Sequence, residues 1–135
     1  MPLKTPAPRP TEGELVILQA LWNSGPQSVR EILHILQAAR PTGYTTVLKT
    51  LQIMTGKDLV ERDETVRPQI YRVRHSREHT QKHMLTDLLD RAFGGSVKTL
   101  VLQALSARKS SEAELKQIEQ LLDSLEADAA KGVAK

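Results

Sequence analysis

The sequence contains no cysteine and few aromatic residues, and each shortage excludes a class of function. Without cysteine the chain has no disulfide, no thiolate metal site and no thiol nucleophile. Aromatic residues make up 3% of the 135 residues, namely Trp22, Tyr44, Tyr71 and Phe93. Surfaces that bind single-stranded nucleic acid stack bases on several exposed rings, so this scarcity argues against that class.

Long apolar runs are also missing. The apolar runs that occur, such as residues 100–102, are far shorter than the ~18 residues of a membrane-spanning helix. The first ten residues contain four prolines and lack the apolar segment of a signal peptide. We therefore expect a soluble, cytoplasmic protein without membrane insertion, in which residues 1–10 form a flexible tail.

Positive charge is concentrated in the first part of the chain. Residues 1–75 hold 10 Lys and Arg against 7 Asp and Glu, whereas residues 76–135 hold 9 against 9. Within the first part, residues 40–75 hold 7 basic against 4 acidic side chains. This bias suggests an anionic partner, although solvated surfaces often carry a similar one.

Three short helices are predicted after the tail. Residues 11–14 (Thr-Glu-Gly-Glu) and 28–31 (Ser-Val-Arg-Glu) fit the capping box, in which the first and fourth side chains satisfy free backbone donors at a helix start. Apolar residues at helical spacing follow each box, and glycine and proline end both helices. The third helix is expected from about Tyr44 to Gly56.

The apolar period then changes from that of a helix to that of a strand. Residues 59–62 and 69–74 alternate as β-strands do, and the polar residues 63–68 form a connection of hairpin length. Three helices followed by a hairpin is the order of a winged helix-turn-helix, which we place at residues 11–75. The predicted fold class is thus mostly α with a small β-hairpin.

Helices with a broad apolar stripe return after residue 75. Ser76, Ser96 and a third capping box at residues 111–114 mark their starts. Because a lone domain of about 60 residues is marginally stable, we predict that residues 76–126 form a helical dimerisation domain and that residues 127–135 fray. The residues expected at the homodimer interface are Leu85, Leu88, Leu89, Phe93, Leu100, Val101, Leu105, Leu115, Ile118, Leu122 and Leu125.

The third helix is the candidate reader of double-stranded DNA, because the second helix of a helix-turn-helix lies in the major groove. Hydroxyl, ammonium and amide groups on its exposed side can bind base edges or phosphates. Each of these side chains has the alternative of being ordinary solvated surface. The residues expected to contact DNA are Thr45, Thr46, Lys49 and Gln52 on this helix, Arg67 at the wing tip, and Lys57 and Arg30 at helix ends.

Histidines raise the alternative of a metal sensor. His75, His79 and His83 are spaced by four residues, which places nitrogen ligands on one side of a helix, and His79 with His83 is the alternative site. Against it, His75 precedes the helix start and no cysteine supports the site. Neither a nucleophile elbow, a glycine-rich phosphate loop nor an H-E-x-x-H motif occurs, so we expect no enzyme activity, no metal and no cofactor.

Several motifs together resemble a known family. Tyr44-Thr45-Thr46-Val47 begins the third helix, and Phe93-Gly94-Gly95-Ser96 separates two later ones. With Leu21-Trp22, Val29-Arg30-Glu31 and Leu88-Leu89-Asp90-Arg91, they stand in unbroken order over about residues 11 to 126. This arrangement is similar to the penicillinase-repressor family of the BlaI, MecI and CopY type.

The resemblance implies a winged-helix domain, a helical dimerisation domain, and repression by a homodimer bound to a palindromic operator. It also implies that Thr45, Thr46, Lys49 and Gln52 fall on the recognition helix and Arg67 in the wing. The rival interpretation from another class is a winged-helix protein-interaction module, whose third helix binds a protein instead of DNA.

The chain departs from the family pattern at several places. Ile53 stands where relatives often have arginine, and Asp58 replaces the glycine that usually ends the third helix. Antibiotic-responsive members are cleaved by a partner sensor protease at an Asn-Phe pair, where this chain reads Leu102-Gln103-Ala104-Leu105. The Cys-x-Cys motifs of copper-responsive members are absent. The inducing signal is therefore open, and a membrane sensor protease is a possible partner.

Overall fold

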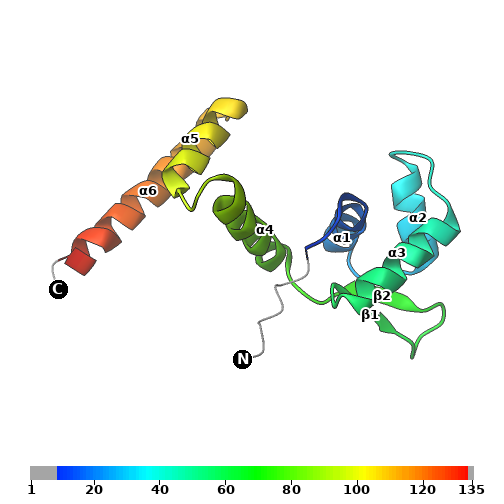
Figure 1. Ribbon diagram of the computed structural model, residues 1–135. Helices are drawn as coiled ribbons and strands as arrows, with labels where there is room; N and C mark the ends of the chain where they lie inside the picture. The colour runs from blue at the N-terminus through cyan, green and yellow to red at the C-terminus, as the bar shows by residue number, and fades with distance from the viewer. Residues whose placement is uncertain (1–8, 134–135) are drawn as a thin grey trace. The chain divides into compact units, whose positions relative to one another are not determined.

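The structure is a computed structural model that describes residues 9–133, which form six helices and one hairpin (Figure 1). The predicted fold class is confirmed. The elements are α1 (Glu12–Ser24), α2 (Val29–Gln37), α3 (Tyr44–Gly56), β1 (Val60–Asp63), β2 (Ile70–Val73), α4 (Arg77–Ala92), α5 (Val97–Ala107) and α6 (Glu112–Val133).

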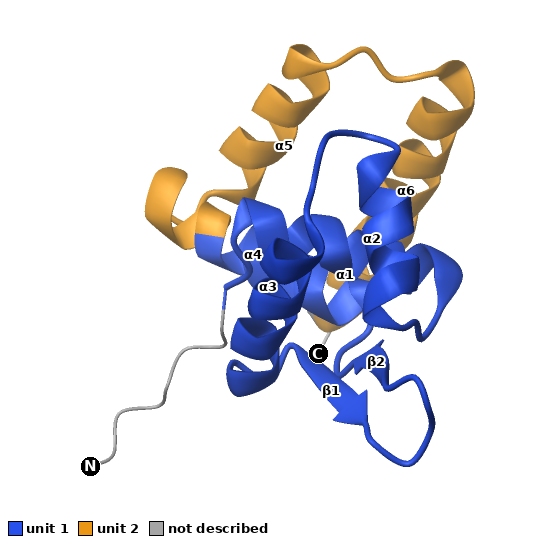
Figure 2. Ribbon diagram, turned by 90° about the vertical axis from the view of Figure 1, so that its right-hand side faces the viewer, with its two compact units in different colours: residues 1–87 blue, residues 88–135 orange. Residues whose placement is uncertain are grey.

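The chain divides into two compact units, residues 1–87 and residues 88–135 (Figure 2). The first unit contains α1, α2, α3 and the hairpin together with most of α4, residues 77–87. The second contains the end of α4 followed by α5 and α6. The boundary between these units thus lies inside α4, later than the start of the predicted dimerisation domain at residue 76.

Capping boxes begin the first two helices, as predicted. The Thr11 hydroxyl accepts a hydrogen bond from the Glu14 backbone N–H (3.2 Å), and the Glu14 carboxylate accepts one from the Thr11 N–H (2.8 Å). Ser28 and Glu31 repeat this exchange at α2. Backbone donors that would otherwise lack a partner at each helix start are thereby satisfied.

One face of α3 packs into the core of the first unit. Val47, Leu51 and Met54 recur at spacings of four and three, so they share one side of the helix, and all three are buried. They pack against apolar side chains from the other elements. These neighbours are Ile17, Leu18, Leu21, Val29, Ile32, Leu36, Leu59, Val60 and Tyr71.

The hairpin is fixed to the helices through Tyr71. Strands β1 and β2 pair antiparallel, with Val60 opposite Val73 and Asp63 opposite Ile70. Gln27, just before α2, adds a bridge: its N–H donates to the Tyr71 carbonyl (3.0 Å), and its carbonyl accepts from the Tyr71 N–H (2.8 Å). The wing therefore has a defined position relative to α2.

Asp58, just after α3, adopts the left-handed backbone conformation that a helix end commonly places on glycine. Its φ is +61°, and the next residue, Leu59, donates its N–H to the carbonyl of Met54 at 2.9 Å. Asp tolerates this conformation less well than Gly but better than most residues. The substitution noted in the sequence therefore leaves the turn itself intact.

The second unit has the predicted helix starts but a later end. Ser96 caps α5 by accepting from the Thr99 N–H, and Ser111 with Glu114 forms the third capping box. Helix α6 continues to Val133, through residues that we expected to fray. Most of these extra residues are alanine or other tolerated helix formers, so nothing in them stops the helix earlier.

Parts of two sequence predictions lie outside the described residues, namely residues 1–8 of the tail and residues 134–135. Where the description begins, the Arg9 guanidinium contacts the Asp87 carboxylate at 3.0 Å. None of the described helices combines the length and the apolar character that a membrane span requires.

Candidate nucleic-acid interface

The outward face of α3 is polar and exposed. Thr45, Thr46, Lys49 and Gln52 are all exposed, opposite the buried stripe that holds the helix in the core. Within the described residues none of these four side chains makes a hydrogen bond or an ion pair. By contrast, the half-buried Thr50 donates its hydroxyl to the Thr46 carbonyl at 2.8 Å. The four predicted residues therefore keep their polar groups available.

The wing presents one cation that no acid of the described chain neutralises. Three of the hairpin's four arginines pair with hairpin carboxylates: Arg62 with Glu64, Arg72 with Asp63 (3.0 Å) and Arg74 with Glu61 (3.6 Å). Arg67, exposed between the strands, has no such partner. The sequence distinguished Arg67 from the other arginines of the wing by its position at the tip, and the structure adds that it is the one without a carboxylate partner among the described residues.

The turn that leads to Arg67 is held by Asp63. Its carboxylate accepts from the Thr65 hydroxyl (2.5 Å) and from the Thr65 backbone N–H (2.9 Å). These bonds, with a smaller contribution from Arg72, hold the pKa of Asp63 below its usual value. The charged carboxylate therefore stabilises the turn at neutral pH.

The excess positive charge of residues 40–75 can now be located. Among the basic side chains of this segment, the described residues provide no acidic partner for Arg40, Lys49 and Arg67. They lie on the connection between α2 and α3, on the outward face of α3, and at the wing tip. The charge bias of the sequence is therefore carried by residues of the helix-turn-helix and the wing.

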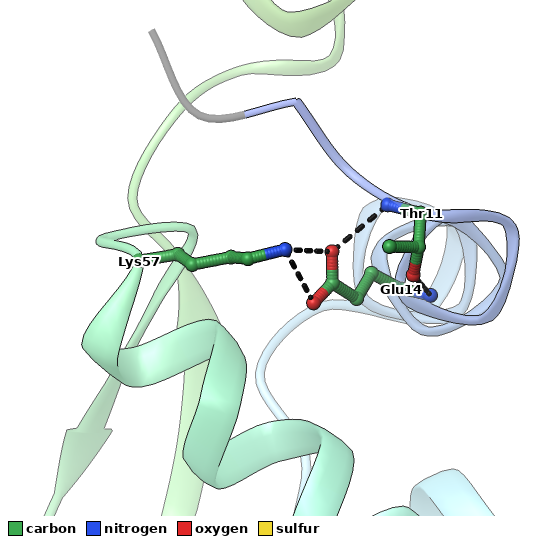
Figure 3. Close-up of polar contacts among 3 residues, drawn as sticks. All are labelled: Thr11, Glu14 and Lys57. Carbon is green, nitrogen blue, oxygen red and sulfur yellow. Dashed lines mark hydrogen bonds and ion pairs between the residues drawn. The ribbon is translucent and has the colours of Figure 1, made fainter. Parts of the chain in front are cut away.

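Lys57, which we expected to contact a phosphate, forms an ion pair within the chain. Its ammonium nitrogen lies 2.9 and 3.0 Å from the two carboxylate oxygens of Glu14 (Figure 3). The Glu14 side chain is 4% exposed and that of Lys57 35%. Because Glu14 also caps α1, one carboxylate joins the start of α1 to the end of α3. Only the capping role of Glu14 was readable from sequence, since nothing in it connects positions 14 and 57.

Arg30 lies beside the start of α3. Its guanidinium carbon is 5.3 Å from the centre of the Tyr44 ring, a cation–π distance. Such contacts are worth about 0.5–1 kcal/mol at exposed sites. The stacking orients the guanidinium near the helix that carries the candidate DNA contacts, without using its N–H donors on an acid.

The rings of the three histidines, called the histidine stack below, lie next to one another, with the first pair stacked and the second pair tilted. The ring centres of His75 and His79 lie 4.7 Å apart, and those of His79 and His83 lie 4.4 Å apart. Desolvation and then the neighbouring rings of His83 and His75 lower the pKa of His79 below its usual value. Throughout residues 9–133, no group of three or more His, Asp or Glu side chains is arranged to hold a metal ion.

The residues expected at the dimer interface are accessible in the single chain. All eleven are either exposed or half-buried, and none is buried. Leu85, Leu88, Leu115, Leu122 and Leu125 are among the large apolar side chains that the chain leaves exposed. Their accessibility meets the requirement for an interface, although it does not identify the partner.

Comparisons with known proteins agree with these features. The profile of the family described as Penicillinase repressor matches residues 10–124. The Transcriptional regulator BlaI of Mycobacterium tuberculosis is 32% identical over 80 residues, both in strain CDC 1551 / Oshkosh and in strain ATCC 25618 / H37Rv. The alignment covers 58% of this chain and 58% of each regulator, so the chain spans less than two thirds of the length of these relatives.

Proposed function

The chain belongs to the penicillinase repressor family, and from this premise we propose that it is a transcriptional repressor that binds double-stranded operator DNA in the cytoplasm. The observation that carries the proposal is where three of the cations of residues 40–75 lie. Arg40, Lys49 and Arg67, which have no acidic partner in the described chain, belong to the α2–α3 connection, α3 and the wing. Phosphates supply the anionic partner that such a surface attracts.

In the proposed complex α3 lies in the major groove. Thr45 and Thr46, at its N-terminal end, contact base edges or phosphates through their hydroxyls, and Lys49 and Gln52 extend these contacts by one to two turns. Arg67 and Arg30 bind the DNA backbone and set the position of α3. Lys57 is left out, because its ammonium is committed to Glu14.

We also propose that the repressor is a homodimer, joined through the apolar stripes of α4, α5 and α6. A two-fold dimer presents two copies of α3, which requires a palindromic operator with half-sites one helical turn, or a multiple, apart. The exposed leucines of the second unit support this proposal, because burying each against a copy removes apolar surface from water.

The release signal is not part of the proposal. Residues 102–105, at the place where antibiotic-responsive relatives are cleaved, lie within α5. A membrane sensor protease acting there would first need the hydrogen-bonded helix to open locally. The neighbouring sequence provides no Asn-Phe pair, so DNA binding is the step that experiments should test first.

Duplex selection tests the proposal directly. A random duplex pool is enriched on the full chain, and affinity for the enriched duplex is measured from 50 to 300 mM salt by fluorescence anisotropy. We expect a steep salt dependence. Lys49→Ala should lower the slope by about one if it binds phosphate, or cost roughly 1–3 kcal/mol in a sequence-selective manner if it binds guanine.

Lys116→Ala, which removes an exposed lysine of α6, is the matched control and should change neither quantity. A weak binding that hardly depends on salt, with no sequence enriched, would instead support the protein-interaction module.

A further inference from the structure

The outward face of α3 contains one large apolar side chain, Ile53. It is 55% exposed, the highest value among the large apolar residues that are described in the first unit. It lies one turn beyond Lys49 and two turns beyond Thr46, so the three side chains follow one another along one side of the helix. Ile53 thus belongs to the face that we propose reads DNA.

Core packing does not account for Ile53. The buried stripe of α3 is formed by Val47, Leu51 and Met54, and residue 53 is rotated by about 100° from residue 54. An isolated exposed isoleucine needs no special explanation. This one is different because its neighbours on the same face are the available polar groups of Thr46, Lys49 and Gln52.

The spacing of this face suits base contacts along its length. Residues 46, 49, 50 and 53 stand at positions i, i+3, i+4 and i+7, the spacing with which the homeodomain helix contacts bases in the major groove. Seven residues of α-helix extend about 10.5 Å. A contact by Ile53 is therefore compatible with simultaneous contacts by Thr46 and Lys49.

The apolar character of the Ile53 side chain determines which group of the DNA it can contact. Isoleucine has neither a donor nor an acceptor, so it cannot read the hydrogen-bonding groups of base pairs. The major groove displays one apolar group, the C5-methyl of thymine. We propose that Ile53 is a specificity-determining residue that contacts a thymine methyl in each half-site, an inference that rests on the proposed DNA-binding function.

Deoxyuridine substitution tests this contact, because deoxyuridine pairs as thymine does but lacks the methyl group. Each thymine of the enriched duplex is replaced singly, and affinity is measured for the full chain. We expect a loss of about fourfold at one thymine per half-site, the equivalent of one methyl group removed from contact. At that position Ile53→Ala should bind the thymine and deoxyuridine duplexes equally.

Two control variants isolate the residue. Ile35→Ala removes an exposed isoleucine from α2 and should retain the discrimination. Thr46→Ser removes the only other methyl group in the row 46, 49, 53 and should also retain it at this position. Circular dichroism of Ile53→Ala should match that of the wild type, because the altered side chain is exposed.

Three results would overturn the inference: a wild type indifferent to every deoxyuridine, an Ile53→Ala variant that still discriminates, or discrimination abolished by Thr46→Ser instead. In each of these cases salt-dependent operator binding persists, so the proposed function stands. If no duplex is enriched at all, the proposed function and the inference fail together.

Discussion

The two units bury their apolar residues to very different degrees. In residues 1–87, Ile32, Leu51 and Met54 are fully buried in a core that three helices and the hairpin complete among themselves. In the described part of residues 88–135 no side chain is buried, although the leucines recur at the same helical spacing. Periodicity therefore predicts which face of a helix is apolar, but not whether its own chain covers that face.

This difference separates two tasks. The first unit has its core closed by internal contacts, so the polar face of α3 is left for a ligand. The second unit leaves large apolar side chains such as Leu121 and Leu122 in solvent, which is unfavourable unless another surface covers them. Under the proposed function, the first unit binds DNA and the second unit joins two copies of the chain into a dimer.

Removing the second unit should have the largest effect. A fragment of residues 1–87 should remain folded and monomeric, because its core does not draw on residues 88–135. Without dimerisation the effective concentration of the second reading helix is lost, so operator affinity should fall by roughly 10²–10⁴. Sedimentation and anisotropy measure both quantities. A dimeric fragment, or one with undiminished affinity, would refute this division of tasks.

One leucine from each unit sharpens the comparison. Leu51→Ala creates a cavity in the closed core and should lower the free energy of unfolding by about 2–5 kcal/mol. Leu122→Ala, at a residue 48% exposed in the single chain, should leave the unfolding of the first unit unchanged and weaken dimerisation. Trp22 fluorescence follows the first unit, and sedimentation equilibrium follows the dimer. A large loss of first-unit stability in Leu122→Ala would break the comparison.

Local patterns of the sequence predicted the helix starts and the order of elements. Thr11-Glu14 and Ser28-Glu31 are contiguous signals whose geometry is complete within one turn, and both formed the expected boxes. The change of period predicted the hairpin for the same reason. Two long-range features were not predicted: the bridge between Gln27 and Tyr71 and the ion pair between Glu14 and Lys57. Both depend on segments that meet only after the core has formed.

The candidate site likewise has features that local sequence patterns predicted and features that depend on long-range contacts. Helical spacing was sufficient to place Thr45, Thr46, Lys49 and Gln52 on one face, because their orientation follows from the buried stripe. Charge alone could not distinguish Arg67 from the paired arginines of the wing, nor reveal that Lys57 is engaged. Which charged side chains form ion pairs depends on the distances between strands and helices in the folded chain, and composition does not give these distances.

Replacing Lys57 should lower the stability of the first unit moderately and leave DNA binding unchanged. Lys57→Met leaves the buried carboxylate of Glu14 without its cation, which we expect to cost about 1–3 kcal/mol; the part-exposed lysine keeps this below the value for a fully buried pair. The slope of log affinity against log salt should be unchanged, because no phosphate contact is lost. Urea unfolding and salt titration measure the two effects.

Glu14→Gln provides the control for that prediction, since it keeps an oxygen for the Thr11 N–H but removes the charge. If Lys57 were a phosphate contact held back by Glu14, this variant would bind all duplexes more tightly and Lys57→Met would lower the salt slope by about one. Either result would restore the phosphate assignment of Lys57.

The smallest predicted effect concerns the histidine stack of α4, in the first unit. The folded pKa of His79 is lowered, chiefly by desolvation and then by His83 and His75, so folding favours the neutral ring. This contribution is fully present above the unfolded value of 6.5 and is lost as pH falls through the lowered folded pKa. Trp22 donates to the His75 carbonyl at 3.4 Å, so its fluorescence reports unfolding at this helix start.

Between pH 8 and 5 the wild type should lose more stability than His79→Gln, whereas His34→Gln, a histidine of α2 outside the stack, should behave as the wild type. Equal pH profiles for all three proteins would show that ionisation of His79 does not contribute to the pH dependence of stability.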